Sequence, residues 1–215
     1  MITRDLAWGS GRFSSRVRFL LAVFSGCDVK NKYWVRNSMG QPVYTAVEDS
    51  DCCERFCCGS MRSYGMTILD NYENEVLRLH RPLRCVSCCF PCCLQRLEVF
   101  AASGQLIGKV EEEWSILFPK FRLTDPAGQK LARIAGPFCT WSICGDVKDT
   151  DGNTIGRIAK QWSGLLKELF TVADNFSVAF SPQLDVTVKA LIFAATFLID
   201  FIYFEKPPEW TNWIR

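Results

Sequence analysis

Short apolar segments recur in pairs along this chain, and the two members of each pair are joined by a turn rich in Gly, Asn or Asp. The pairs occupy residues 33–47, 66–79, 97–110, 121–134 and 147–158. Two short alternating segments separated by such a turn are the sequence signature of a β-hairpin. Five hairpins predict a mainly β domain.

The alternation of side chains indicates that each predicted strand has one buried face. In residues 97–101, for example, Leu97 and Val99 alternate with Glu98 and Phe100, and successive side chains of a strand point to opposite faces. A sheet of this many strands tends to close on itself, because a barrel leaves no unpaired edge. We therefore expect a closed barrel built from hairpins.

The periodicity changes from strand to helix after the last hairpin. Apolar residues follow at helical spacing and form one stripe: Trp162, Leu165, Leu166, Leu169 and Phe170. This pattern favours an amphipathic helix that lies on the sheet, and a helix on a membrane surface is the alternative.

The most apolar segment of the chain is 186–204, which predicts a helix that is apolar on all sides. Two charges, Lys189 and Asp200, interrupt it, and the uncharged run between them has ten residues. Such a run makes about 15 Å of helix, whereas the hydrocarbon core of a bilayer is about 30 Å thick. Two interpretations stay open: a helix that fills the barrel, with Phe193, Phe197 and Phe204 among its core residues, or a helix that spans the bilayer.

Composition limits the classes of function without choosing among them. The chain has 215 residues, with 25 basic and 23 acidic side chains, so nothing suggests a nucleic-acid partner. We expect one main domain at 31–206, preceded by a partly disordered or helical segment at 1–30 and followed by a tail at 207–215. The apolar run 19–24 is too short for a secretion signal, which favours a reducing compartment for the twelve cysteines. The Arg- and Ser-containing start leaves a mitochondrial presequence as a minor alternative.

Five of the cysteines gather within residues 85–93, after a basic approach formed by Arg78, Arg81 and Arg84. Disulfides are awkward for adjacent cysteine pairs. Zinc is a minor alternative, in which Cys53 and Cys57 would join Cys85 and Cys88 across space. Thioester acylation fits best, since several accessible thiols anchor a protein more stably than one.

Specific motifs along most of the chain resemble those of the phospholipid scramblase family. They are the segments 81–85 (RPLRC), 117–121 (LFPKF), 144–147 (CGDV), 161–164 (QWSG), 173–176 (ADNF) and 197–201 (FLIDF), together with the cysteine segment. The resemblance implies a tubby-like closed β barrel of about 12 strands that encloses a hydrophobic C-terminal helix, in agreement with the hairpin pattern.

The resemblance also implies two sites. The acylation motif of the family falls on Cys88, Cys89, Cys92 and Cys93, which predicts covalent palmitate. Its calcium segment falls on 172–183, with Val172 and Gln183 where the family usually has aspartate. The remaining candidate residues are Asp174, Asn175, Phe176, Phe180 and Asp185. Because calcium prefers six to eight oxygen ligands, this degenerate segment predicts a weakened or lost calcium response.

The function that the resemblance implies is ATP-independent, bidirectional movement of phospholipids between the leaflets of a membrane. The alternative is a palmitoylated lipid- or protein-binding signalling module without intrinsic scrambling. We do not expect an enzyme, since no nucleophile or phosphate-binding motif stands out. The expected partners are membrane phospholipids with anionic headgroups, a homo-oligomer is left open, and the expected location is the cytosolic side of the plasma membrane.

Overall fold

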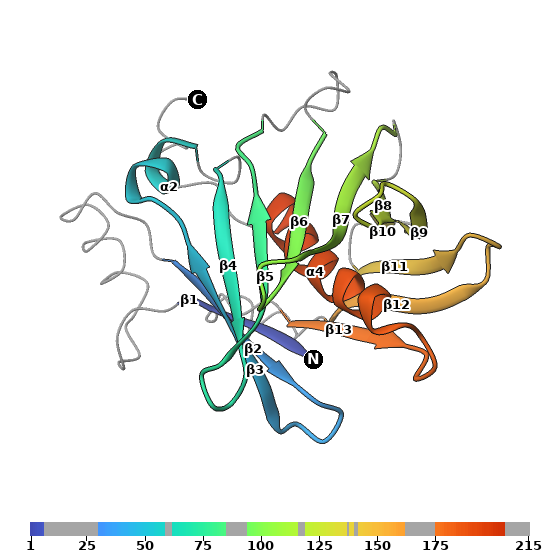
Figure 1. Ribbon diagram of the computed structural model, residues 1–215, viewed down its shortest axis with the longest axis horizontal. Helices are drawn as coiled ribbons and strands as arrows, with labels where there is room; N and C mark the ends of the chain where they lie inside the picture. The colour runs from blue at the N-terminus through green and yellow to red at the C-terminus, as the bar shows by residue number, and fades with distance from the viewer. Residues whose placement is uncertain are drawn as a thin grey trace.

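A computed structural model of the chain describes residues 1–6, 30–58, 62–84, 94–115, 119–136, 138–139, 142–161 and 175–204. Within these residues a single thirteen-stranded sheet surrounds one long helix (Figure 1). The strands are β1 (Ile2–Leu6), β2 (Asn31–Arg36), β3 (Pro42–Asp49), β4 (Tyr64–Leu69), β5 (Glu75–Arg81), β6 (Arg96–Ala101), β7 (Leu106–Glu113), β8 (Lys120–Thr124), β9 (Lys130–Ala135), β10 (Phe138–Cys139), β11 (Ser142–Asp149), β12 (Thr154–Gln161) and β13 (Asn175–Phe180). The helices are α2 (Cys52–Cys58) and α4 (Val186–Tyr203).

Strand pairing closes the sheet into a barrel. Neighbouring strands pair antiparallel from β1 through β9, and from β11 through β13 back to β1. The ring closes because β9 also pairs with β11, with Ala135 opposite Asp146 and Ala132 opposite Asp149. Only β10 stands outside this ring, as a short ladder on β11. The predicted closed barrel of about twelve strands is therefore confirmed.

All five predicted hairpins are present, and their turns share one geometry. In each, the amide of the first turn residue donates to the carbonyl four residues later, as from Asn37 to Gln41 and from Asp70 to Asn74. The fourth turn residue has a positive φ, and it is glycine in four hairpins and Glu73, at φ 64°, in the fifth. Glycine suits this position because it has no Cβ to clash in the left-handed region.

Antiparallel order separates the two ends of the barrel. The five tight turns lie at one end, here named the hairpin end, with two of them at the bottom of Figure 1. The other connections join the opposite end, here named the connection end, where α2 lies at the top of Figure 1. Helix α4 starts at the hairpin end and finishes at the connection end.

Four elements were not predicted: β1, β10, α2, and β13, which falls within the predicted calcium segment. Strand β1 pairs with β2 and β13, so Ile2–Leu6 belongs to the barrel although the pattern had assigned residues 1–30 to a partly disordered or helical segment. Its five residues hold apolar side chains only at the two ends, which gives no strand periodicity. Helix α2 has seven residues, too few for a helical stripe. The predicted stripe at 162–170 lies outside the described residues.

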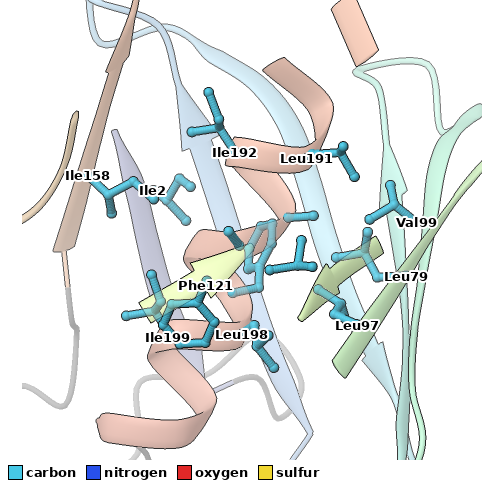
Figure 2. Packing of buried hydrophobic residues seen from close by; sticks show 14 of the residues in the cluster. Ile2, Leu79, Leu97, Val99, Phe121, Ile158, Leu191, Ile192, Leu198 and Ile199 are labelled. Carbon is cyan, nitrogen blue, oxygen red and sulfur yellow. The ribbon is translucent and has the colours of Figure 1, made fainter. Parts of the chain in front are cut away.

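Helix α4 lies inside the barrel and forms the centre of its core. Every residue from Ala194 to Phe201 is buried, together with Val188, Leu191 and Ile192. Figure 2 shows Ile2, Leu79, Val99 and other inward-facing strand residues around the helix. By length and composition α4 is long and apolar enough to cross a membrane, and 61% of it is buried here. The structure therefore shows the first of the two interpretations of 186–204, a helix enclosed by the barrel.

Candidate functional site

A polar and aromatic cluster surrounds the C-terminal half of α4, and it explains why an apolar helix carries a carboxylate. Tyr33, on β2, donates a hydrogen bond from Oη to Oδ2 of Asp200 over 2.7 Å, and both groups are buried. The Tyr33 ring also meets the Phe197 ring edge-on, with 4.9 Å between centroids. Buried polar groups of this kind are stable only with hydrogen-bond partners, so Asp200 fixes the position of α4 within the barrel.

A buried ion pair stands beside this contact. Nε of Arg62 donates to Oε1 of Glu48 over 2.8 Å, and the backbone and side-chain nitrogens of Asn31 donate to Oε2. Burial alone would raise the pKa of Glu48, but the hydrogen bond and charge of Arg62, with Ser50 and Asn31, hold that pKa below its ordinary value. Glu48 is therefore ionised at neutral pH and ties the starts of β2 and β4 to the end of β3.

Arginine and aromatic side chains extend the cluster across the mouth of the barrel. Arg81, fully buried at the end of β5, donates from Nη2 and Nε to Oε1 of Gln95 over 2.6 and 3.1 Å. Its guanidinium lies 5.6 Å from the centre of the Tyr64 ring, and Tyr64 stacks on Phe201 with 4.0 Å between centroids. Arg62 lies over the other ring of this stack, 5.0 Å from the centre of Phe201. Such desolvated cation–π contacts stabilise the plug formed by the end of α4.

The last turn of α4 is anchored in the same way. Tyr203 donates from Oη to Oε1 of Glu112 on β7 over 3.2 Å. Burial, followed by the charge and the hydrogen bond of Glu112, raises the pKa of Tyr203 above its ordinary value. The phenol therefore stays neutral and keeps donating. Two hydrogen bonds, at Asp200 and Tyr203, and the aromatic and cation–π contacts of Phe201 thus hold the helix end to the barrel wall.

The remaining predicted helix residues line α4 from its start to its end. Lys189 lies near the hairpin end and donates from Nζ to the carbonyl oxygen of Pro182 over 2.7 Å. Phe193 packs against the Phe197 ring at 5.0 Å, and Phe204 meets the Phe176 ring at 5.5 Å. Phe197 and Phe176 belong to the buried core, and Phe193 and Phe204 are partly buried and pack against it.

The described members of the predicted calcium segment do not meet at one point. Asn175 and Phe176 begin β13 at the connection end, and the Phe176 side chain is buried in the core. Phe180 ends that strand, and Asp185 follows it at the hairpin end, where Oδ1 accepts from the amide of Thr187 and caps α4. A six-residue strand is about 17 Å long from first to last Cα, so Asn175 and Asp185 cannot bind one ion. Asp174 lies outside the described residues.

Comparison with known proteins decides the family. The model of the family described as Scramblase matches residues 15–206. The chain belongs to the scramblase family. It is 48% identical to phospholipid scramblase 1 of Mus musculus, over 87% of this chain and 58% of the relative. It is also 48% identical to phospholipid scramblase 2 of Bos taurus, over 86% of this chain and 65% of the relative.

A further relative, phospholipid scramblase family member 5 of Homo sapiens, is 42% identical over 86% of this chain and 70% of the relative. The chain spans less than two thirds of the length of the first four curated relatives that it matches. No solved structure matches it.

The predicted lipidation residues, Cys88, Cys89, Cys92 and Cys93, lie outside the described residues. The described residues on either side of them, Arg84 and Leu94, lie at the connection end, where Nη1 of Arg84 donates to the carbonyl of Leu94 over 3.0 Å. Of the three basic residues before the cysteines, Arg81 is buried and Arg78 forms an ion pair with Glu75.

Other cysteines of the chain bear on the zinc alternative. Cys52 is disulfide-bonded, so the expectation of reduced thiols is wrong at that residue, whereas Cys53 and Cys58 are free thiols. Cys85 and Cys88 lie outside the described part of the chain. Among the residues that the structure does describe, no three His, Cys, Asp or Glu side chains gather as a metal site would require.

An acidic cleft of about 320 Å³ lies at the connection end of the barrel and was not predicted. Asp49, Asp51 and Glu54 line it, together with His80 from β5. The run of acidic residues at 48–51 was its only sequence signal, because the pairing of β4 with β5 is needed to bring His80 beside it.

Proposed function

We propose that this chain is a phospholipid scramblase-like membrane protein that moves phospholipids in both directions between bilayer leaflets without ATP. The observation that carries the proposal is 48% identity, over most of the chain, to proteins that are themselves named phospholipid scramblases. Such transport breaks no covalent bond, so the protein acts on membrane phospholipids as a transporter rather than as an enzyme.

Attachment to the membrane through covalent palmitate is part of this proposal. Cys88, Cys89, Cys92 and Cys93 would carry the acyl chains, and the described residues on either side of them, Arg84 and Leu94, lie at the end of the barrel where α4 finishes. Two or more acyl chains give stable anchoring where one gives only marginal binding. The cytosolic face of the plasma membrane, with its anionic headgroups, is the proposed location, and a mitochondrial membrane is the minor alternative.

Acylation is tested by hydroxylamine-sensitive labelling of the protein expressed in animal cells. Replacing Cys88, Cys89, Cys92 and Cys93 by serine should abolish the label. The matched control replaces the free thiols Cys53 and Cys58 by serine and should keep it. A label that survives the first set of substitutions would place the acyl chains elsewhere.

A weakened or lost calcium response also belongs to the proposal. It is supported by Val172 and Gln183 in the predicted segment and by the separation of Asn175 from Asp185 along β13. Isothermal titration of the full chain should give no calcium heat in the micromolar range. Micromolar binding that is lost in Asp185→Asn would instead mean that the segment rearranges into a site. Zinc is a further alternative, which metal analysis of the purified protein would decide.

A second function is favoured by the position of α4. A helix sealed within a barrel cannot line a lipid path across a bilayer, because the path would need lipid contact along the helix. A palmitoylated lipid- or protein-binding signalling module, without intrinsic scrambling, would keep the same fold. A homo-oligomer is compatible with either function.

One experiment separates the two functions. The purified chain is reconstituted into liposomes that contain a fluorescent phospholipid, and dithionite is added from outside while calcium is titrated from chelated to millimolar. Quenching beyond the outer-leaflet share, compared with protein-free liposomes, supports intrinsic scrambling, and its size without calcium tests the calcium proposal. Quenching that stops at the outer-leaflet share, with incorporation verified, favours the signalling module.

A further inference from the structure

Two large apolar side chains are exposed at the connection end of the barrel. Leu83, just beyond β5, is 56% exposed, and Trp114, just beyond β7, is 51% exposed. Each follows the inward-facing row of its own strand: Leu83 comes two residues after buried Arg81, and Trp114 two residues after Glu112. They therefore continue the interior rows past the end of the barrel and stand on the rim of its mouth.

The strands between and beside these residues are neighbours, which makes the rim continuous. Strand β6 lies between β5 and β7, and Gln95 bonds to Glu112 across β6 and β7. Adjacent strands are about 4.8 Å apart, so the rim positions of β5 and β7 are about 10 Å apart across the sheet. Leu83 and Trp114 thus belong to one surface, which we name the β5–β8 rim and define as Leu83, Arg84, Leu94, Trp114 and Lys120.

The charges of this rim suit an anionic partner. Arg84 uses one guanidinium nitrogen to bond the carbonyl of Leu94, and Lys120 starts β8 opposite Glu113, the residue before Trp114. Within the described residues, neither Arg84 nor Lys120 forms an ion pair with a carboxylate. Tryptophan prefers the headgroup region of a bilayer, and each nearby basic residue adds attraction to anionic lipid.

The hairpin end of the barrel also exposes large apolar side chains. Met39 and Tyr72 are even more exposed there, at 78% and 85%, and their hairpins touch through a bond from Asn71 to the carbonyl of Pro42. The turns of that end carry acidic residues, including Glu73 and Asp151, both exposed. Apolar exposure alone therefore does not distinguish the two ends, and both ends carry exposed basic residues. In the β5–β8 rim, Arg84 directly follows Leu83, so a cation and an exposed apolar side chain stand together.

We propose that the β5–β8 rim is a membrane-docking surface, in which Leu83 and Trp114 insert among the headgroups of an anionic lipid bilayer while Arg84 and Lys120 contact phosphate. It rests on the proposed membrane function, but it requires neither acyl chains nor scrambling. Docking in this way turns the mouth of the barrel, with the end of α4, toward the lipid surface.

The test uses the full chain produced in bacteria, which carries no palmitate, and measures co-sedimentation with phosphatidylcholine vesicles with and without phosphatidylserine. Leu83→Ser with Trp114→Ser should lower partition into the mixed vesicles by about tenfold or more. Met39→Ser with Tyr72→Ser is the matched control and should change it less than about twofold. Arg84→Gln with Lys120→Gln should weaken binding only to the phosphatidylserine vesicles and reduce its sensitivity to salt.

Three results would overturn the proposal: equal loss in the rim and control variants, unchanged binding of both rim variants, or loss of self-association without loss of vesicle binding. The last would make the rim an interface between copies. Near-ultraviolet circular dichroism checks that each variant is folded. Failure of the proposed function is separate, since a protein that binds vesicles through this rim and does not scramble lipid contradicts only scrambling.

Discussion

Enclosure of α4 makes Phe197 a core residue, and Phe197→Ala tests this directly. Its side chain is 1% exposed, and its ring meets the rings of Tyr33 and Phe193 at 4.9 and 5.0 Å. Replacing a buried Phe by Ala costs about 3 to 5 kcal/mol, and each aromatic pair adds about 0.5 to 1.5 kcal/mol beyond its buried area. With two such pairs we expect the free energy of unfolding to fall by about 4 kcal/mol or more.

The matched control is Val186→Ala, at the start of the same helix, where the side chain is 77% exposed. We expect a change within about 0.5 kcal/mol. Alanine has the higher helix propensity in both positions, so a loss at Phe197 cannot come from the helix itself. Urea unfolding of the unacylated full chain, followed by tryptophan fluorescence, measures both values. Equal stabilities of the two variants would refute the enclosed helix.

Three further substitutions test the barrel wall. Gly108→Ala would place Cβ 2.3 Å from the Thr124 carbonyl oxygen, and we expect it to lower the free energy of unfolding, measured in urea, by about 3 kcal/mol. Gly65→Ala is the control, because its nearest contact would be at 3.6 Å, and it should be close to neutral. Equal effects of the two substitutions would contradict the close approach of Gly108 to Thr124. Glu73 has a positive φ of 64°, so Glu73→Gly should relieve backbone strain and raise the free energy of unfolding by about 1 kcal/mol. A lower free energy of unfolding would show that the Glu73 side chain contributes more stability than the strain costs. The lowered pKa of Glu48 means that its contribution is complete above pH 4.5 and disappears as pH falls through the folded-state pKa. Glu48→Gln should lower the free energy of unfolding by about 3 to 5 kcal/mol at neutral pH, and the variant should lose less stability than the parent protein as the pH falls. An unchanged dependence of stability on acid pH would contradict the role of the ion pair.

The hairpins could be predicted because their information is local. A glycine at the left-handed position and an Asn or Asp at the start of most of the turns lie within a few residues of the strands that they join. The enclosed helix could also be anticipated, since Lys189 and Asp200 leave too short an apolar run for a simple span. Local sequence patterns therefore predict both the strands of the barrel and the helix that it encloses.

The site could not be predicted in the same way, because its contacts join distant parts of the chain. The partner of Asp200 is 167 residues away, and Tyr203 reaches Glu112 across 91 residues. Arg81 illustrates the difficulty: in sequence it belongs to a basic run before the cysteines, yet pairing with β4 and β6 buries it among Tyr64 and Gln95. Whether a charged side chain is buried depends on which strands become neighbours in the sheet. The periodicity of apolar and polar residues along the sequence does not contain that information.

Enclosure of α4 also constrains how any scrambling works. Moving the helix into lipid would exchange one apolar environment for another, with little gain, and would leave an empty barrel and the buried Glu48 and Arg62 without their aromatic cover. Lipids should therefore be handled from outside the barrel while α4 stays in place. A photoreactive phenylalanine analogue at Phe197 should cross-link to barrel residues in actively scrambling liposomes, and the same analogue at Trp114 should cross-link to lipid. Lipid adducts at Phe197 that rise with scrambling activity would show instead that the helix leaves the barrel to act.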